Sequence, residues 1–426
     1  MKTLRIFCRV FIGLLFIFSG YVKAIDPIGS QIIFMEDFKA FQMPFLIPFT
    51  MFFGVVLSTV EILIGCCALM GIRMKETAWL NLLFMSFMTI FTFILAVFNP
   101  VTDCGCFGEA IKLTNWETFF KNILVIMPVT IVMFWQRNKY KSVASCRVEW
   151  ITVACLTLLT LALMHYSFRH LPSIDFMSYR VGTNIEEAMT YPENAQPDVY
   201  ETILHYKKDG KTQDFTIQNL PDSTWKFVDA ITTLVKKGYE PPIHDFAIIS
   251  QEGVDITNMV LNLDGYVLLL SIPYTEKASL KNKDAINAIA DYCLIQDNMH
   301  FFALSSSGDE ALIEYARKTG AMYPFYMTDE KPLLSMVRSN PGLLLMKDAV
   351  VLAKWSHYDI PTPEKLSEKI RTQSPEKMIA EYELRERLTT EIIAVALFAA
   401  MILWGIICRR IFRKNGNTAK LFAEKA

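Results

Sequence analysis

Six long runs of apolar residues constrain this 426-residue chain more than any other feature. A stretch of roughly 18 or more apolar residues is long enough to cross a bilayer as a helix. The runs cover approximately Leu4–Val22, Phe45–Met70, Trp79–Phe98, Trp116–Trp135, Trp150–His165 and Thr390–Cys408. Tryptophans lie at or near several of their ends, where indole rings prefer the membrane interface. The sequence therefore predicts a multi-pass α-helical membrane protein.

Basic residues beside these runs predict the orientation of the chain. They cluster before the first run, between the second and third, between the fourth and fifth, and after the sixth. All four clusters fall on one side if every run crosses, and Lys and Arg favour the cytoplasmic side. We therefore expect both termini in the cytoplasm, with the loop 99–115 and residues 166–389 outside it. If "VKA" before Ile25 is a signal-peptide cleavage site, the remaining spans keep this orientation.

Composition excludes several classes of function. A formal net charge of −1 gives no electrostatic footprint for nucleic acid. The sequence contains no phosphate-binding glycine loop, zinc-helix motif or catalytic-triad pattern, and we expect no metal site. The functional residues must be sought elsewhere.

The nine cysteines divide by compartment. Six lie in or near the cytoplasmic ends of the spans or in a cytoplasmic loop, where small apolar or reduced thiols are ordinary. Only Cys104, Cys106 and Cys293 face the oxidising side. Cys293 lies on the apolar side of the helix-like segment "AINAIADYCLIQ", so we expect a buried thiol. Cys104 and Cys106 are left to pair with each other or with a partner protein.

Cys104 and Cys106 lie in "NPVTDCGCFGEA", residues 99–110. Cysteines two apart can bring their Cα atoms within the roughly 4.4–6.8 Å that a disulfide requires, and Gly105 lowers the backbone cost of so tight a ring. Strain makes such a bond easier to reduce. Gly108 allows a turn, and "TNWE" is a capping-box pattern that opens the next span. From these residues alone, a redox pair, a structural disulfide and half of a metal site all remain open.

Three segments resemble the MauE/DoxX group of four-helix membrane proteins: "RVFIGLLFIFSGYVKAIDP", "VEILIGCCALMG" and "DCGCFG". The resemblance covers about residues 1–140. MauE-like proteins are associated with methylamine utilisation, where they work beside a thioredoxin-like partner in maturing a disulfide-rich enzyme. The arrangement is also similar to that of quinone-linked disulfide-forming proteins of the bacterial inner membrane.

The resemblance implies that Cys104 and Cys106 are a catalytic thiol–disulfide relay. It implies as electron partner either a membrane quinone, with no covalently bound cofactor, or a separate thioredoxin-like protein or disulfide-containing client.

Glu61 lies well inside the second span, where an ionisable group is costly. Arg9 enters the first span from the same side, and we expect a buried Arg9–Glu61 ion pair that locks two helices. A role for Glu61 in binding a quinone or a proton is the alternative. Gly13 and Gly20, seven residues apart, predict close helix packing.

Residues 241–358 alternate strand-like and helix-like segments, which predicts an α/β layer fold. We expect a short strand in "IHDFAIISQ", a buried strand at Tyr266–Ile272, a helix around Asp284–Gln296, a strand and a helix in 301–320, and a final strand pair. Their order, and Pro341 just before that pair, resemble the periplasmic thioredoxin-like family, in which Pro341 corresponds to the cis-proline. The family's Cys-X-X-Cys belongs directly after Tyr266–Ile272, where this chain has "PYTEKASLKNK". The resemblance therefore implies a thioredoxin-like domain without its dithiol.

The predicted order of domains follows from these segments. It is a four-helix membrane domain (1–140), a fifth span (141–170), an outward α+β insert (171–240), the thioredoxin-like domain (241–358), a charged helical linker (359–389), and a sixth span with a cytoplasmic tail (390–426). In the insert, "VYETILHY" and "KTQDFTIQ" predict a hairpin, and "DSTWKFVDAITTLVKKG" predicts a helix.

Two hypotheses of function follow. The first is a membrane thiol–disulfide redox protein of the cell envelope, MauE-like and of the methylamine-utilisation type, with a docking thioredoxin-like domain. The second is a non-enzymatic membrane assembly or binding protein in which Cys-Gly-Cys is a structural disulfide. The redox potential of the loop separates them.

Overall fold

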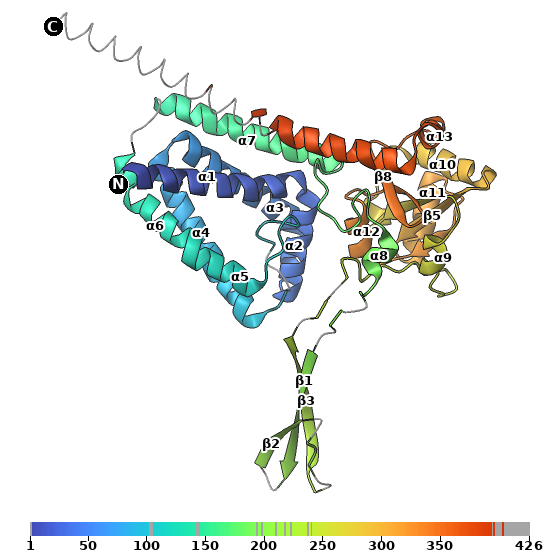
Figure 1. Ribbon diagram of the computed structural model, residues 1–426, viewed down its shortest axis with the longest axis horizontal. Helices are drawn as coiled ribbons and strands as arrows, with labels where there is room; N and C mark the ends of the chain where they lie inside the picture. Colours follow the sequence, from blue (N-terminus) through green and yellow to red (C-terminus); the bar gives the residue numbers. More distant parts are fainter. Residues whose placement is uncertain are drawn as a thin grey trace, which may run out of the picture.

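The computed structural model shows a helical bundle joined to an α/β domain, with a three-stranded sheet extending from the latter (Figure 1). The structure describes residues 2–101, 105–140, 145–192, 195–196, 199–208, 211–216, 219–221, 224–236, 238–239, 241–393, 395–396 and 403. Cys104, most of the predicted sixth span and the tail after it lie outside the described residues. Structural statements below concern the described residues.

Five helical stretches are long and apolar enough to cross a membrane: Thr3–Ile25, Pro44–Met70, Met74–Phe98, Asn115–Trp135 and Cys146–Arg169. They correspond to the first five predicted runs. Their helices are α1 (Lys2–Ile25), η1 (Pro44–Phe49), α3 (Thr50–Met70), α4 (Met74–Phe98), α5 (Asn115–Phe120), η2 (Lys121–Ile126), α6 (Met127–Trp135) and α7 (Cys146–Arg169). The 3-10 turn η3 (Arg137–Lys139) precedes α7. The predicted helical membrane bundle is confirmed.

The fourth span changes its helical pitch in the middle. The segment η2 has π-helical hydrogen bonding and is followed directly by α6, whose second residue is Pro128. Proline has no N–H to donate and its ring crowds the preceding turn, so a widened π turn relieves both problems. The capping box predicted at "TNWE" opens α5: the Thr114 hydroxyl accepts from the Glu117 amide, and the Glu117 carboxylate accepts from the Thr114 amide.

Helices α1 and α3 pack closely enough to require glycine. A Cβ on Gly65 would lie 2.7 Å from the Ile17 backbone nitrogen, and one on Gly20 would lie 2.9 Å from the Ile62 nitrogen. Small residues let helix backbones approach in this way in membranes. The close packing predicted from Gly13 and Gly20 is confirmed, with Gly65 as its counterpart on α3.

Helix α2 (Pro27–Ala40) lies between the first two spans, where the sequence reading placed no element. Its signals are those of an ordinary helix start. Asp26 is the N-cap and accepts a hydrogen bond from the Gly29 amide, and Pro27 occupies the first helical position. In Figure 1, α2 forms the side of the bundle that faces the α/β domain.

The α/β domain is built on a five-stranded sheet of order β6-β5-β4-β7-β8. Strands β4 (Tyr266–Ile272), β5 (Met299–Ser305) and β6 (Phe325–Met327) are parallel to one another. Strand β7 (Gly342–Lys347) is antiparallel to β4, and β8 (Val350–Ser356) is antiparallel to β7. Its helices are α8 (Ile185–Met189), α9 (Thr257–Leu261), η4 (Thr275–Lys277), α10 (Lys283–Ile295), α11 (Asp309–Thr319), α12 (Glu330–Met336) and α13 (Pro363–Thr372). This is the thioredoxin-like architecture that the sequence resemblance implied. The short strand expected in "IHDFAIISQ" is reduced to isolated bridges at Ile249.

Both faces of this sheet are buried, because alternate residues of β4 point to opposite sides. Val267 and Leu269 pack with α8, α9 and α12, whereas Leu268 and Leu270 pack with α10 and α13. Each of these four side chains has an exposed fraction of 2% or less. A strand buried on both faces reads as a continuous apolar run, as "YVLLLSI" does.

The insert is an antiparallel sheet of order β2-β1-β3, made of β1 (Val199–Lys208), β2 (Lys211–Thr216) and β3 (Lys226–Lys236). The predicted hairpin is confirmed, because β1 pairs with β2. The helix predicted in "DSTWKFVDAITTLVKKG" is wrong: this segment forms β3. Its aromatic and β-branched residues favour a strand, and pairing with β1 outweighs the helical spacing of its apolar residues. Figure 1 shows this sheet standing away from the domain.

The α/β domain is attached to the bundle at both of its chain ends. It follows α7 directly, and a helix over residues 375–393 returns along α7 (Figure 1). The two connections are bonded to each other, since the Asp175 amide donates to Oε1 of Glu386 at 2.7 Å. Lys354 of β8 forms a buried ion pair with Asp175 at 2.7 Å.

Candidate functional site

The loop that carries Cys106 is folded by two glycines with positive φ, Gly105 (+59°) and Gly108 (+54°). The Gly108 amide donates to the Gly105 carbonyl at 2.9 Å, which closes a tight turn around Cys106 and Phe107. L-residues with side chains rarely adopt this backbone region, so glycine is required at both positions. The turn predicted at Gly108 is confirmed. Cys104, the other half of the predicted relay, lies outside the described residues.

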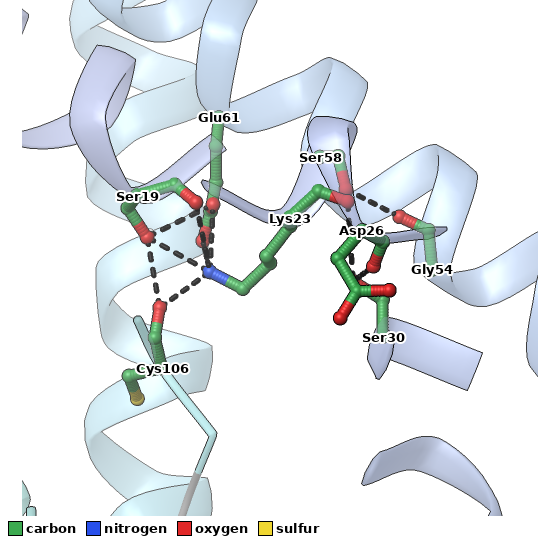
Figure 2. A network of polar contacts seen from close by, with 8 residues as sticks. All are labelled: Ser19, Lys23, Asp26, Ser30, Gly54, Ser58, Glu61 and Cys106. Carbon is green, nitrogen blue, oxygen red and sulfur yellow. Dashed lines mark hydrogen bonds and ion pairs between the residues drawn. The ribbon is translucent and has the colours of Figure 1, made fainter. Parts of the chain in front are cut away.

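A buried polar network lies directly beneath this turn (Figure 2). The Lys23 ammonium lies 2.9 Å from Oε2 of Glu61 and donates to the Ser19 hydroxyl at 2.8 Å. It also donates to the carbonyl oxygen of Cys106. The Ser19 hydroxyl lies within hydrogen-bonding distance of both the Glu61 carboxylate (3.0 Å) and the Cys106 carbonyl (2.9 Å). The backbone of Cys106 is therefore held by two side chains of α1, which are in turn bonded to Glu61 of α3.

The geometry of this network follows from helical spacing. Ser19 and Lys23 are four residues apart on α1 and so lie on one face, one turn above the other. Glu61 faces them from α3, across the interface that Gly20 brings close. The side chains of Lys23 and Glu61 are only 3% and 5% exposed. A charge in such a place is tolerated only when it is paired and hydrogen-bonded, and both conditions are met here.

The predicted Arg9–Glu61 ion pair is wrong. The Arg9 guanidinium instead donates to the backbone carbonyls of Ala68 (2.9 Å) and Leu69 (3.0 Å) at the end of α3. The last carbonyls of a helix have no intrahelical partner, and arginine satisfies them well. Arg9 and Glu61 therefore both connect α1 with α3, but through separate contacts.

An apolar cavity of about 470 Å³ opens beside the loop, between α2, α3 and α4. Gly105, Cys106 and Lys23 are among the residues that line it, together with Ser30 and Asp37, and the rest of the lining is phenylalanine and aliphatic side chains. Ligand sites are commonly cavities of roughly 300–1,000 Å³ with a few polar groups at a fixed place. This cavity has both features.

The α/β domain contacts the membrane part next to the same loop. Arg338, which is 4% exposed, donates to Oδ2 of Asp26 at 3.1 Å and lies 4.0 Å from Oε1 of Glu109. Asp26 ends α1 and caps α2, while Glu109 belongs to the cysteine loop. A second pair, Lys331 with Glu36 of α2 at 3.1 Å, is exposed. The domain is therefore seated on the bundle at the edge of the Cys-Gly-Cys loop.

Arg338 belongs to the loop that leads to Pro341, and the Asn340–Pro341 peptide bond is cis, as the resemblance implied. The Ser339 hydroxyl lies 2.7 Å from the Pro341 carbonyl and 2.8 Å from Nδ1 of His357. Burial and then the nearby Lys281 hold the pKa of His357 below its usual value. The loop that turns toward the membrane part is thus internally bonded.

The position of the thioredoxin dithiol is occupied by "PYTEK", which forms η4 after β4. Cys293 lies on α10 in the core beneath the sheet and is 4% exposed, as expected. Burial raises the pKa of its thiol to about 12. A buried thiol of this kind is inert to exchange. The domain holds no cysteine suited to redox chemistry.

Within the described part of the chain, no group of three or more His, Cys, Asp and Glu residues is placed to hold a metal ion. Ser19, Lys23, Asp26 and Arg338 were not predicted as site residues from the sequence. A lysine inside an otherwise apolar span was the available signal for Lys23. For Asp26 and Arg338, which are 312 residues apart, the sequence offered none.

Two segments of the chain match known family models. Residues 1–136 match the family model described as "Methylamine utilisation protein MauE". Residues 200–237 match a domain of unknown function, DUF8463, which corresponds to the three-stranded insert. No curated protein matches the chain.

Three solved structures are similar to about 30% of the chain. A protein described as a disulfide isomerase of Bacteroides thetaiotaomicron shares 13% identity and has a TM-score of 0.24, covering 30% of this chain and 82% of its own. A secreted disulfide oxidoreductase of Mycobacterium tuberculosis, homologous to E. coli DsbE, shares 8% at a TM-score of 0.25, covering 30% and 96%. A DsbF homologue of Corynebacterium diphtheriae shares 13% at 0.23, covering 30% and 87%.

Proposed function

We propose that this protein is a thiol–disulfide relay in a bacterial inner membrane. Its residues 1–136 match the MauE family model, and the chain continues into a thioredoxin-like domain. Cys104 and Cys106 alternate between dithiol and disulfide, facing the periplasm together with residues 166–389. Both termini lie in the cytoplasm. The partner is a separate thioredoxin-like protein or a disulfide-containing client of the kind that methylamine-utilisation proteins mature.

One observation carries this proposal. The Cys106 carbonyl accepts from Lys23 and lies beside Ser19, and both side chains are tied to Glu61. A loop whose backbone is fixed while its two cysteines change bonding state can return to the same geometry after each cycle. Preorganising a reactive group in this way lowers the cost of each exchange. A structural staple would not require a charged network beneath it.

The thioredoxin-like domain serves as a docking unit in this proposal. It has lost its dithiol, and Cys293 is buried. Its Pro341-bearing loop is seated beside the cysteine loop through Arg338, Asp26 and Glu109. A partner held by this domain would meet Cys104 and Cys106 at a high effective concentration without any chemistry in the domain itself.

The test is a redox titration of the full chain in native membranes. Glutathione buffers of stepped potential are followed by mass-tag alkylation of the free thiols. We expect the tags on Cys104 and Cys106 to titrate together at a potential well above the roughly −300 mV typical of structural disulfides. Cys293→Ser is the matched control and leaves the titration unchanged. A pair that stays oxidised at about −300 mV supports the staple instead.

The second test asks whether the disulfide exchange belongs to the membrane domain alone. The full chain with Cys104→Ser and Cys106→Ser should catalyse no disulfide reduction or oxidation in a standard insulin or reduced-RNase assay, because the α/β domain carries only a buried thiol. Activity above background in this variant would place the chemistry in the domain and refute the docking assignment.

A further inference from the structure

A second buried carboxylate lies near the cysteine loop, on α2. Asp37 is 6% exposed and lines the cavity that Cys106 also lines. The residues of α2 in this lining recur every three or four positions and so share one face of the helix. They are Ser30, Ile33, Phe34, Asp37, Phe38 and Phe41. Asp37 therefore stands in the middle of a largely apolar face, where burying a carboxylate is costly.

The same face of α2 supports the cysteine loop. A Cβ on Gly105 would lie 2.7 Å from Cδ1 and 2.8 Å from Cγ2 of Ile33, so the loop rests on this side chain. Asp37 follows Ile33 by four residues, which places it on the same face and about 6 Å further along the axis. A carboxylate that shares a cavity with a thiol can exchange a proton with it directly or across one water. Asp37 has this relation to Cys106.

The other charged groups beside Cys106 are occupied. Lys23 also lines the cavity, but its ammonium already contacts Glu61 and the Ser19 hydroxyl. It also donates to the Cys106 carbonyl. Figure 2 shows Lys23 and Glu61 on the carbonyl side of Cys106, with the sulfur pointing away from them. Among the described residues that line the cavity, Asp37 is therefore the carboxylate that can serve the thiol.

We propose that Asp37 is the proton acceptor for the Cys106 thiol during disulfide exchange. The inference rests on the proposed function, because it assigns a further residue to the same reaction. When Cys106 attacks a disulfide of the partner, its S–H proton passes to the Asp37 carboxylate and its sulfur forms a new S–S bond.

The rest of the exchange returns this proton. The attacked S–S bond breaks, its electron pair stays on the leaving sulfur, and this thiolate takes the proton from Asp37. Cys104 then attacks the mixed disulfide, and its own proton goes to the second leaving thiolate. The partner leaves as a dithiol and the Cys104–Cys106 bond is closed. Asp37 ends ionised, as it began, so the partner's disulfide is the only oxidant that the cycle requires.

The experiment follows Cys106 as a single thiol in the full chain with Cys104→Ser, reduced and placed in nanodiscs without oxygen near neutral pH. Two reactions are timed by mass spectrometry of the loop peptide: exchange with oxidised glutathione, and alkylation by iodoacetamide. Both need a thiolate and access to the loop. Only exchange has a leaving group that takes up a proton, since iodide does not. The ratio of the two rates therefore separates proton transfer from changes in access or in thiolate fraction.

We expect Asp37→Asn to lower the ratio of exchange to alkylation by about tenfold or more. Asp37→Glu keeps a carboxylate and should retain most of the ratio. Glu36→Gln is the matched control and should leave it unchanged. Glu36 is the adjacent acid of α2, does not line the cavity, and forms an exposed pair with Lys331 that a small disulfide does not need.

A second measurement requires no substitution at Asp37, and so decides the matter if Asp37→Asn fails to fold. In heavy water, exchange should slow more than alkylation, because a proton is in transit only during exchange.

The outcomes separate this inference from the proposed function. An unchanged ratio in Asp37→Asn, or equal slowing of both reactions in heavy water, overturns the role of Asp37. The relay still stands in that case if Cys104 and Cys106 titrate together in glutathione buffers. If neither glutathione nor diamide can cycle the pair, the relay fails and this inference fails with it.

Discussion

At the scale of single residues, the ion pair of Lys23 and Glu61 decides whether the cysteine loop has a support. Glu61→Gln leaves a buried ammonium without its counter-charge. Removing one partner of a buried pair typically costs about 3–5 kcal/mol. We therefore expect a marked loss of folded protein, measured as the monodisperse fraction and melting temperature in detergent.

A second variant distinguishes support from chemistry. Lys23→Met combined with Glu61→Leu removes both charges and should recover much of the lost stability, since apolar replacements of a buried pair are often neutral. The loop should then be less ordered, so alkylation of the reduced Cys106 should become faster. A Glu61→Gln protein with normal melting and no redox activity would make the carboxylate catalytic instead.

Gly105 allows a second prediction at this scale. A Cβ at this position would lie 2.7 Å from Cδ1 of Ile33 on α2, in addition to the cost of positive φ. At Gly108 the nearest atom, in Val22, is 3.2 Å away. Both substitutions to alanine carry the backbone cost of about 1–2 kcal/mol, and Gly105→Ala adds the collision. We expect Gly105→Ala to lower the melting temperature more than Gly108→Ala, and Ile33→Ala to relieve the difference.

Residue types in the sequence predicted part of this site. Cysteines two apart with an intervening glycine, and a glutamate inside a span, were visible because each is out of place in an apolar segment. The partner of Glu61 was not, because both Arg9 and Lys23 belong to the same helix. Arg9 and Lys23 lie on nearly the same face of α1 and about 21 Å apart along its axis. Which of the two meets the carboxylate therefore depends on the axial position of α1 against α3, where Gly13, Gly20 and Gly65 make the close contacts.

At the scale of elements, the α1–α3 contact is the most constrained. A Cβ on Gly65 would meet backbone atoms, the Ile17 nitrogen at 2.7 Å and the Gly13 oxygen at 2.8 Å, which a rotamer change cannot relieve. On Gly54 the nearest atom is the Ser30 side chain at 3.2 Å. Gly65→Ala should therefore separate the helices and lower the melting temperature, with Gly54→Ala much milder. Equal melting of the two variants would contradict the packing described here.

The turn after β8 makes the domain sensitive to acid. The folded pKa of His357 lies below its usual value of about 6.5, because burial disfavours the charged ring and Lys281 repels it. The unfolded chain then binds the proton more readily, so stability falls as the pH drops below about 6.5. We expect the melting temperature of the full chain to decrease from pH 7.5 to 5.5, and His357→Gln to reduce that decrease. An unchanged slope would remove His357 as its source.

Helices and strands whose apolar residues recur at a clear spacing were predictable from the sequence. The five described spans and the strand–helix order of the sheet follow from apolar runs bounded by turn residues. The segment that forms β3 misled the reading because its apolar residues also fit a helical spacing, and only pairing with β1 decides between the two. Helix α2 escaped notice because it carries both apolar and polar residues without a marked apolar face.

At the scale of the whole molecule, the seat of the domain on the bundle depends on Arg338. Arg338→Gln should free the N-terminus of α2 and the cysteine loop, because Asp26 loses its cation and Glu109 keeps only its pair with Lys112 in the same loop. Hydrogen–deuterium exchange of the full chain in nanodiscs should then increase in residues 26–30 and 105–112. Lys331→Gln, in an exposed pair, is the control and should change little. Unaltered exchange in Arg338→Gln would mean that the pair does not hold the domain.

Orientation is a property of the whole chain as well. The four basic clusters lead us to expect a reporter fused at Asn262 to read as periplasmic and one fused after Ala426 to read as cytoplasmic. A cytoplasmic signal at Asn262 would overturn the membrane topology and the relay together. No sequence pattern could place the domain against the loop, since Arg338 and Asp26 meet only after every span has packed.

The domain's two chain ends have a mechanical consequence. A body on one flexible tether explores a sphere, whereas one held at two neighbouring points retains mainly rotation about the line that joins them. Here the points are the end of α7 and the helix over residues 375–393, fastened together between Asp175 and Glu386. The Pro341 loop can therefore move relative to Cys106 mainly along a hinge-like arc. Each time the domain swings back along this arc, Arg338 meets Asp26 and Glu109 again.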